Sequence, residues 1–243
     1  MRTEQPSTGT EKATRAKATY DRIAGVYYTP AHPTSNAFDK TIGNYLRKKS
    51  SIAGRLGVHL DVGCGRSKLS EIPYLGTAVF IDLSLRMLLQ SELDESKDAV
   101  VGSALHLPIA NDSIETVYSF IGDAFACKEF FQEAFRVLKT KGAILEILPT
   151  KVWAETLRKE LGISSDTTYF LDNGVKLFAP SIVFSGEDLV NILRKVGFSS
   201  VGWENLFLPD DFHEVPKHIE IPSKILGVDP YDLPLLVAVR AIK

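Results

Sequence analysis

Residues 58–67 read VHLDVGCGRS, and this stretch decides the fold of the 243-residue chain. A short apolar run ends there in an acid and two glycines, the pattern with which a buried strand turns into a helix. Asp82 closes a second apolar run, residues 78–81, nineteen positions after Gly63. A carboxylate at that distance suits a ribose, because two vicinal hydroxyls can donate to one carboxylate at the tip of the neighbouring strand. Together the two stretches predict a site for a nucleoside cofactor.

The spacing of the glycines indicates which kind of nucleoside. A dinucleotide-binding fold uses G-x-G-x-x-G, in which the third glycine lets helix and strand pack closely beside a pyrophosphate. Here Gly63 and Gly65 are followed by Lys68 at the third position. Asp61, two residues before the first glycine, is placed to receive a cationic group such as an ammonium. A nicotinamide oxidoreductase is therefore the less favoured interpretation.

The acid and glycine pattern resembles the first motif of the class I S-adenosylmethionine-dependent methyltransferases, D/E-x-G-x-G, which is followed by an acid that ends the next strand. Residues 100–108 (VVGSALHLP) are similar to the third motif of that family, and residues 111–117 (NDSIETV) to the run that leads into its fourth strand. Residues 130–142 end in RVLKTKG, like the family's sequence before the fifth strand, and residues 20–28 (YDRIAGVYY) resemble its N-terminal segment. The resemblance covers roughly residues 20–208.

The family resemblance implies a Rossmann-like, doubly wound α/β fold, with a seven-stranded sheet that is mostly parallel and has an antiparallel last hairpin. The hydrophobic pattern supports it, because short apolar runs alternate with helical segments, as in a parallel sheet covered on both faces. The runs are residues 59–62, 79–82, 99–102, 116–120 and 143–148. A helix from Ser185 to a stop at Gly197 precedes the last two predicted strands, residues 198–208 and 235–242.

Three inserts outside this alternation are expected to cover the substrate, near residues 18–50, 150–183 and 209–233. Helical spacing occurs at residues 18–28, 36–49 and 152–161, with an irregular stretch predicted from there to Pro180. Aromatic side chains of the inserts indicate an at least partly apolar substrate, with ordinary core packing as an equal alternative. They are Trp153, Tyr169, Phe170, Phe178, Phe207 and Phe212. Residues 1–17 are polar and are expected to form a disordered tail before a single domain, residues 18–243.

The composition is that of a soluble globular protein, with 44% hydrophobic and 24% charged residues and a formal net charge of −2. This balance does not indicate a nucleic acid as substrate. No apolar run approaches the roughly 20 residues of a membrane helix, and the first residues have no apolar signal core. Cys64 and Cys127 make no disulfide framework, so a reducing, cytoplasmic location is expected. The oligomeric state stays open.

The resemblance implies S-adenosylmethionine as cofactor, with S-adenosylhomocysteine as product. Asp61 would meet the ammonium and Asp82 the ribose. Further candidates for the cofactor site are the residues at matching motif positions, namely Gly63, Cys64, Gly65, Leu83, Ser103, Ala104, Ser119, Tyr20 and Arg22. Of these, Tyr20 or Arg22 would donate to the methionine carboxylate, while amphipathic packing is the alternative for Tyr20.

Three positions depart from the family pattern. Ser103 stands where an acid usually accepts from the adenine amino group, and a neutral hydroxyl gives a hydrogen bond worth on the order of 1 kcal/mol. Arg66 stands where many members have a small residue, and it either extends to solvent or binds a substrate carboxylate. Ser67 replaces the usual next glycine.

Methyl transfer from a sulfonium is an in-line displacement, in which alignment alone can contribute roughly 7–11 kcal/mol. The expected acceptor is an oxygen, nitrogen or carbon nucleophile of a small molecule. Asp123 follows the fourth strand and is a candidate base or substrate anchor, with a helix N-cap as the alternative; Tyr20 is the second catalytic candidate. No metal is expected, because histidines and cysteines lack ligand spacing.

Two other interpretations stay open. The fold could bind the cofactor but catalyse a non-methyl step such as a cyclisation, or act as a binding module. A methyltransferase of nucleic acid or protein is a variant within the main class.

Overall fold

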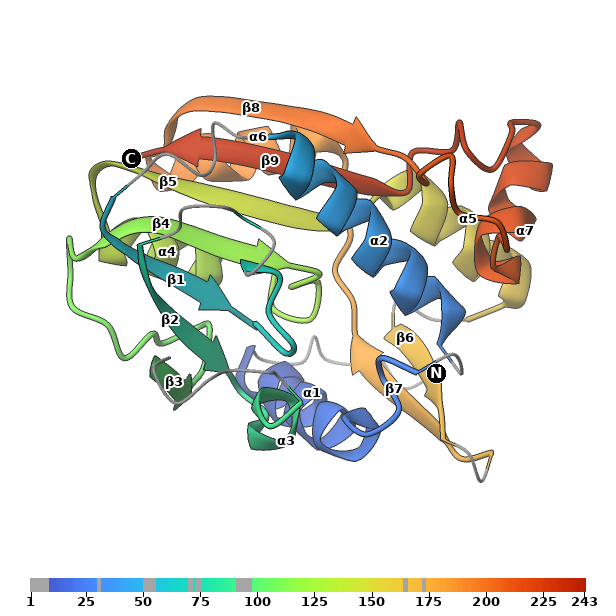
Figure 1. Ribbon diagram of the computed structural model, residues 1–243, viewed down its shortest axis with the longest axis horizontal. Coiled ribbons are helices and arrows are strands. Elements are labelled where there is room, and N and C mark those ends of the chain that lie inside the picture. The colour runs from blue at the N-terminus through green and yellow to red at the C-terminus, as the bar shows by residue number, and fades with distance from the viewer. Residues whose placement is uncertain are drawn as a thin grey trace, which may run out of the picture.

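A seven-stranded sheet forms the centre of the computed structural model, which describes residues 9–29, 32–49, 56–69, 72, 76–90, 98–163, 166–171 and 174–243. The strand order is β3-β2-β1-β4-β5-β9-β8 (Figure 1). The strands are β1 (Val58–Val62), β2 (Thr77–Asp82), β3 (Asp98–Val101), β4 (Ile114–Phe120), β5 (Leu138–Pro149), β8 (Ser199–Leu206) and β9 (Leu236–Ile242). β1 to β5 pair in parallel, whereas β9 is antiparallel to both β5 and β8. The predicted doubly wound fold with an antiparallel last pair is confirmed.

Helices lie on both faces of this sheet (Figure 1). They are α1 (Gly9–Ile23), α2 (Pro33–Lys48), α3 (Leu85–Leu88), α4 (Lys128–Val137), α5 (Lys151–Leu161), α6 (Gly186–Val196) and α7 (Lys217–Leu226). None of the helices in the described ranges is long and apolar enough to cross a membrane.

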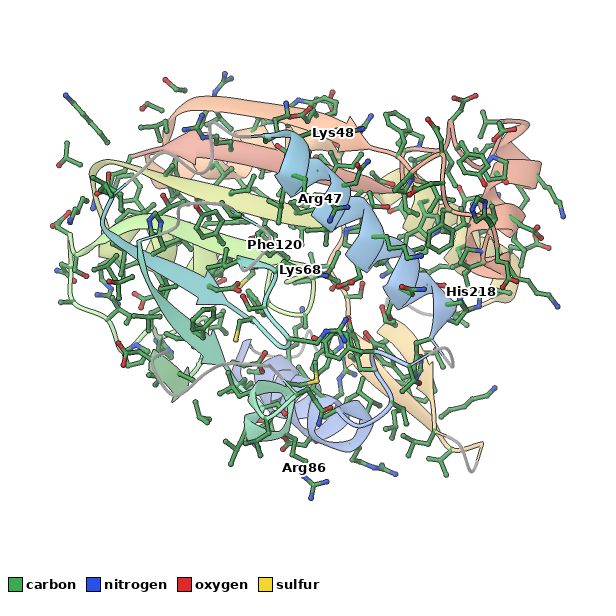
Figure 2. All side chains as sticks on the ribbon, in the orientation of Figure 1. Arg47, Lys48, Lys68, Arg86, Phe120 and His218 are labelled. Atoms are coloured by element: carbon green, nitrogen blue, oxygen red, sulfur yellow. The ribbon has the colours of Figure 1, made fainter. Side chains whose placement is uncertain are left out.

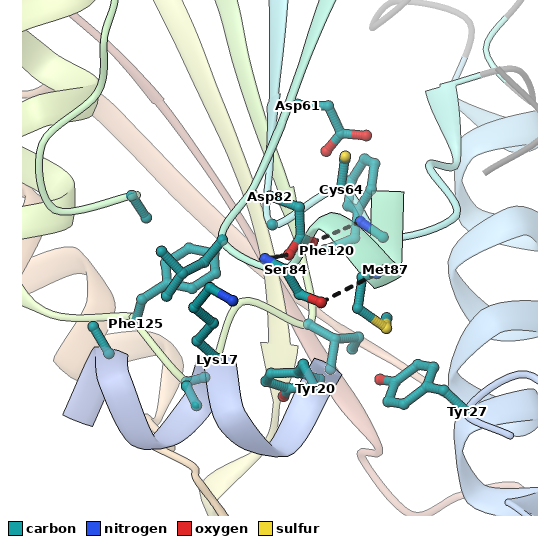
Figure 3. Close-up of a pocket in the computed structure, with 18 of the residues that line it drawn as sticks. Lys17, Tyr20, Tyr27, Asp61, Cys64, Asp82, Ser84, Met87, Phe120 and Phe125 are labelled. Atoms are coloured by element: carbon teal, nitrogen blue, oxygen red, sulfur yellow. Dashed lines mark hydrogen bonds between the residues drawn. The ribbon is translucent and has the colours of Figure 1, made fainter. Parts of the chain in front are cut away.

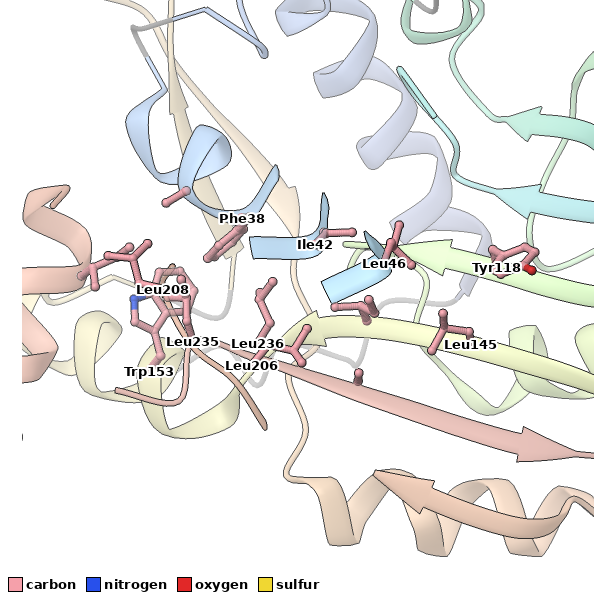
Figure 4. Packing of buried hydrophobic residues seen from close by; sticks show 14 of the residues in the cluster. Phe38, Ile42, Leu46, Tyr118, Leu145, Trp153, Leu206, Leu208, Leu235 and Leu236 are labelled. Carbon is pink, nitrogen blue, oxygen red and sulfur yellow. The ribbon is translucent and has the colours of Figure 1, made fainter. Parts of the chain in front are cut away.

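The apolar side of α2 packs on one face of the sheet. Phe38, Ile42 and Leu46 recur at helical spacing and join Tyr118 of β4 and Leu145 of β5 in one buried cluster (Figure 4). Each such side chain contributes roughly 1.5–3 kcal/mol by leaving water. This packing holds α2 above β4 and β5, so the start of the helix reaches the C-terminal ends of the strands.

The opposite face of the sheet is covered by α4 and α6. Phe130 and Phe131 of α4 and Leu189 and Leu193 of α6 are fully buried in a second cluster with strand residues such as Val117. The boundaries of α6 follow the sequence signals: Ser185 and Asp188 form a reciprocal capping box, and Gly197 ends the helix with a φ of 121°.

The prediction of a disordered tail over residues 1–17 is wrong for residues 9–17, because α1 begins at Gly9; residues 1–8 lie outside the described part. Ala16, Thr19 and Ile23 are buried at helical spacing. The Thr19 hydroxyl donates to the carbonyl of Phe178 at 2.7 Å. The helix is therefore stabilised by a segment about 160 residues away, which the composition of the tail could not reveal.

The prediction of an irregular stretch before Pro180 is also wrong. β6 (Asp166–Phe170) and β7 (Lys176–Pro180) form a separate antiparallel hairpin. Tyr169, Leu177 and Ala179 of this hairpin enclose Ile23 of α1 in a small buried cluster. The hairpin thus holds α1 beside the ends of β1 and β2 (Figure 1).

Candidate active site

The turn after β1 requires glycine at two positions. Gly63 and Gly65 have φ values of 67° and 45°, in the left-handed region that other residues rarely adopt. A Cβ atom at Gly63 would lie 2.6 Å from Cε1 of Phe125. The N–H groups of Gly63 and Cys64 both donate to the carbonyl of Ile81, which fastens the turn to β2.

Asp82 ends β2 and faces this turn. Its Oδ2 atom accepts from the N–H of Gly65 at 3.0 Å, and its Oδ1 atom accepts from the N–H of Ser84 at 2.8 Å (Figure 3). Burial raises the pKa of the carboxyl, although the donated backbone hydrogen bonds oppose the increase. A carboxylate accepts up to about four hydrogen bonds. Asp82 therefore keeps capacity for a pair of ligand hydroxyls.

Asp61 lies at the end of β1 and is almost completely buried, with an exposed fraction of 1%. Its Oδ2 atom accepts from the Ser67 hydroxyl at 2.6 Å. Its Oδ1 atom has no hydrogen-bond partner among the described residues. Burial raises the pKa of this carboxyl to about 7, and the charge of Asp82 adds to the increase. A cation at this wall would supply the missing partner and stabilise the ionised form.

The two acids line a single cavity of about 350 Å³ at the C-terminal ends of the strands, where ligands bind in open α/β sheets. Figure 3 shows Asp61 and Asp82 on one side of it and Lys17 and Tyr20 of α1 on the other. At the β3 end the wall is formed by Leu83, Ser103, Ala104 and Phe125, and at the α2 end by Ser35, Phe38, Asp39 and Ile42.

α1 is fastened over the cavity by polar contacts. The buried Ser84 hydroxyl donates to Oδ1 of Asp21 at 2.6 Å and accepts from the N–H of Met87 at 3.1 Å. It therefore serves both as the N-cap of α3 and as a link to α1. Asp21 is also bonded to Lys17 at 2.5 Å, one helical turn away on α1.

Aromatic residues close the cavity between α1 and α2. Tyr20 and Tyr27 pack edge to face, with ring centroids 6.2 Å apart, and both contact Tyr169 of the hairpin. Burial, with the nearby charge of Asp123, raises the pKa of Tyr20 well above its ordinary value. Tyr20 is therefore a neutral phenol at any physiological pH, able to donate and accept hydrogen bonds.

Most of the sequence-predicted cofactor residues meet at this cavity. Asp61, Gly63, Cys64, Gly65, Asp82, Leu83, Ser103, Ala104 and Tyr20 all line it. Ser103 also accepts from the N–H of Leu105 at 3.2 Å, so its hydroxyl shapes the loop after β3 as well as facing the cavity. Three predicted residues are not among the lining residues: Arg22, Ser119 and Asp123.

These three side chains lie elsewhere for identifiable reasons. Arg22 is exposed on α1, because it is two residues and thus about 200° around the helix from Tyr20. Ser119 is fully buried and donates to Oε1 of Glu146 on β5 at 3.3 Å. Asp123 is buried behind the wall, where burial raises its pKa to about 6, opposed by a hydrogen bond from Ser181.

The predicted insert aromatics do not form the cavity wall. Trp153, Tyr169 and Phe212 are buried core residues, and Phe178 and Phe207 are exposed; the side chain of Phe170 lies outside the described part. Residues 209–233 contribute no described residue to the wall, and residues 150–183 contribute Ile182. The aromatic wall is instead Tyr20, Tyr27, Tyr28, Phe38, Phe120 and Phe125. Helical spacing could have found Phe38, but not the residues that reach the cavity from turns.

Comparison with known proteins finds sequence similarity over about a third of the chain. Residues 60–145 match the family model of the methyltransferase domain. An uncharacterised protein of Methanocaldococcus jannaschii is 35% identical over 88 residues, which are 35% of this chain and 34% of that protein. The match thus spans about a third of the length of this curated relative.

Solved structures share the fold over nearly the whole chain. A chain from the complex containing the Trm112 methyltransferase activator of Haloferax volcanii has a TM-score of 0.67 and 15% identity, and covers 93% of this chain and 96% of its own. The 1,6-didemethyltoxoflavin-N1-methyltransferase of Burkholderia thailandensis, with bound S-adenosylhomocysteine, has a TM-score of 0.56 and 14% identity, and covers 98% and 92%. A S-adenosylmethionine-dependent methyltransferase of Archaeoglobus fulgidus has a TM-score of 0.56 and 17% identity, and covers 84% and 94%.

The sheet order, the acid and glycine turn and the domain match agree. Residues 60–145 thus match a methyltransferase domain, and the described chain has the fold of the class I S-adenosylmethionine-dependent methyltransferases. S-adenosylmethionine is the cofactor of this class. The site fits it, since the incompletely bonded Asp61 and the carboxylate of Asp82 stand at one cavity.

Proposed function

We propose that the chain transfers a methyl group from S-adenosylmethionine to an oxygen, nitrogen or carbon nucleophile of a small molecule. The observation that carries this proposal is the pair Asp61 and Asp82, on adjacent strands and at the wall of one cavity. When bound, the cofactor supplies an electrophilic methyl group on a sulfonium that is its own leaving group.

In this proposal the residues of the chain bind and orient. Asp61 holds the cationic amino group and Asp82 the ribose hydroxyls, while Ser103 and Ala104 face the base. Tyr20, a neutral phenol, donates a hydrogen bond at the wall and excludes water together with Tyr27. Alignment in a dry cavity is the main contribution that such a site can make.

The acidic side chains of the cavity indicate which kind of acceptor the site can use. Its acidic lining residues are Asp39, Asp61, Asp82 and Glu129, and the described lining holds no histidine. Asp39 is paired with Lys68 at 2.7 Å, so its carboxylate already has a cationic partner. Asp123 is separated from the wall, and we assign it to holding the loop after β4 through Ser181. An acceptor that needs no strong base, such as a neutral amine or an acidic hydroxyl, fits best.

The free thiols of Cys64 and Cys127, both at the cavity, fit a reducing compartment, and we include a cytoplasmic location in the proposal. The size of the cavity, about 350 Å³, favours a small acceptor over a macromolecule.

Calorimetry and mass analysis test the proposal. We expect S-adenosylhomocysteine to bind with a micromolar dissociation constant, and incubation with S-adenosylmethionine and an acceptor pool to give products heavier by one methyl group. The absence of binding up to millimolar concentration would refute cofactor use. Binding with consumption of the acceptor, but with a product lacking the added methyl group, would favour the non-methyl alternative instead.

A further inference from the structure

Arg66 follows the glycine turn and lines the cavity with a partly exposed side chain, and none of the roles above uses it. Its guanidinium carbon is 4.4 Å from the ring centroid of Tyr28, and its backbone N–H donates to the hydroxyl of the same tyrosine at 2.8 Å. One partly buried ring therefore contacts both the backbone and the side chain of Arg66. An arginine held in this way loses little rotamer entropy when it binds an anion.

The hydrogen-bonding capacity of Arg66 is not used by its neighbours. Asp39 is 3.8 Å from the guanidinium, beyond hydrogen-bond distance, and forms its short contact of 2.7 Å with Lys68. Within the described part of the chain, no hydrogen bond is formed by the guanidinium of Arg66. Arg66 and Lys68 both face Asp39, so two cationic side chains lie at this end of the cavity. The side chain is 40% exposed, so a ligand can reach it.

This cationic end faces α2, on the other side of β1 from the nucleoside end. One side of α2 forms a wall of the cavity, with Ser35, Phe38, Asp39 and Ile42 at helical spacing. The acid Asp39 and the apolar side chains of Phe38 and Ile42 therefore lie on the same wall. Figure 2 shows Lys68 on the side of the sheet that α2 covers. The nucleoside end, formed by Asp82 and the loop after β3, lies toward the opposite edge of the sheet.

We propose that Arg66 binds a carboxylate of the methyl acceptor, so that the acceptor is an amphipathic carboxylic acid whose apolar body packs on Phe38 and Ile42. This inference rests on the proposed function and names its substrate class. The planar guanidinium matches a carboxylate with two parallel hydrogen bonds. The apolar part of the wall supplies a place for the remainder of the molecule.

The test compares matched acids and amides on the protein saturated with S-adenosylhomocysteine and on the protein alone. The probes are phenylacetate, 3-phenylpropionate and hexanoate, each paired with its primary amide, and binding is followed by ligand-observed NMR. We expect at least one acid to bind ten times more tightly than its amide. The preference is expected to disappear in Arg66→Gln, to weaken in Arg66→Lys, and to persist in Arg194→Gln, which alters an exposed arginine of α6.

Three results would overturn the inference: no acid binds, acids and amides bind equally, or the preference survives in Arg66→Gln. A control with two cofactor analogues gives a fourth result that would overturn the inference. If Arg66→Gln weakens S-adenosylhomocysteine tenfold but leaves 5′-methylthioadenosine unchanged, then Arg66 holds the methionine carboxylate and not the acceptor. We expect both affinities to stay within threefold of the wild type, which also shows that the variant is folded. Failure of the wild type to bind S-adenosylhomocysteine would refute the proposed function separately, since the acids are also titrated without it.

Discussion

The carboxylate of Asp82 accepts a hydrogen bond from the backbone N–H of Gly65 at 3.0 Å, so the acid that ends β2 and the turn that follows β1 form one unit. The conformation of the turn and the direction of the acid are thus set by the protein itself. Preorganisation of this kind lowers the entropy that a ligand must lose on binding.

Asp82→Asn is expected to weaken S-adenosylhomocysteine binding at least tenfold. The amide keeps the shape of the side chain but has no charge, and a hydrogen bond to a charged group contributes about 1.5–3 kcal/mol. Isothermal titration calorimetry measures the change. The control Asp98→Asn removes an exposed acid at the start of β3, and equal effects of the two substitutions would contradict the assignment of Asp82 to the ribose.

The affinity for S-adenosylhomocysteine should rise with pH between about 6 and 8. The pKa of Asp61 is raised to about 7, so at lower pH the carboxyl is largely protonated and cannot pair with an ammonium. Calorimetric titrations at pH 6, 7 and 8 measure the trend. In Asp61→Asn the affinity should be lower and flat over this range; a slope of wild-type size in that variant would assign the titration to another group.

Glu146→Gln should make the stability less sensitive to an increase in pH above about 4.3. Burial raises the pKa of Glu146 well above its ordinary value, and the Ser119 hydrogen bond only partly opposes this. The folded protein then binds more protons than the unfolded chain, whose glutamate pKa is about 4.3, and stability is lost as pH rises above that value. Each pKa unit corresponds to about 1.4 kcal/mol.

Urea unfolding of Glu146→Gln at pH 5 and pH 8 measures this effect. The variant should gain free energy of unfolding relative to the wild type at pH 8, with a smaller difference at pH 5. Glu187→Gln, at an exposed position of α6, should show no such gain. A loss of stability in Glu146→Gln that is larger at pH 8 than at pH 5 would mean that the carboxyl forms a favourable ionised interaction.

Gly63→Ala should destabilise the protein by roughly 1–3 kcal/mol, because an alanine is strained at the positive φ of Gly63 and its Cβ atom would overlap with the ring of Phe125. The same substitution should abolish measurable binding of S-adenosylhomocysteine. Two glycine controls separate these causes. Gly162 has a φ of 60° with nothing within 4 Å of the position that a Cβ atom would take, and Gly25 has neither feature. Thermal unfolding should rank Gly63→Ala, Gly162→Ala and Gly25→Ala from most to least destabilised, and the two controls should bind the ligand normally.

Ser84→Ala should accelerate dissociation of S-adenosylhomocysteine about fivefold, because it removes the bond from Ser84 to Asp21 that fastens α1, worth about 1 kcal/mol. Stopped-flow measurement of the dissociation rate gives the effect. Ser185→Ala removes another N-cap serine, on α6 and away from the cavity, with a comparable loss of stability. Similar dissociation rates in both variants would show that general stability, and not the fastening of α1, controls release.

The sequence predicted those parts of the site that depend on residues close together along the chain. Asp61, Gly63 and Asp82 are short-range signals, each fixed by the end of a strand and the turn after it. Alternating strands and helices likewise required the parallel sheet. Arg22 lies away from the cavity because Tyr20 faces it, and a side chain two positions later on α1 points to another side of the helix.

What the sequence did not reveal are contacts between distant segments. Tyr28 meets Arg66 across 38 positions, and Asp21 meets Ser84 across 63. The hairpin of β6 and β7 reads as irregular because its buried residues complete their cluster only with Ile23. Contacts of this kind depend on which segments the folded sheet brings side by side, so no short stretch of sequence predicts them.

The covering helix α1 is held by Ser84, the N-cap of α3, and by the packing of its Ile23 on the hairpin of β6 and β7, whereas Asp61 and Asp82 belong to strands of the central sheet. The strand acids and the helix that covers them are therefore held by separate contacts. Substitutions at Tyr20 or Lys17 should change the enclosed volume and leave Asp61 and Asp82 in place. In the proposed function, a change of acceptor would accordingly arise from substitutions in α1, with both strand acids kept.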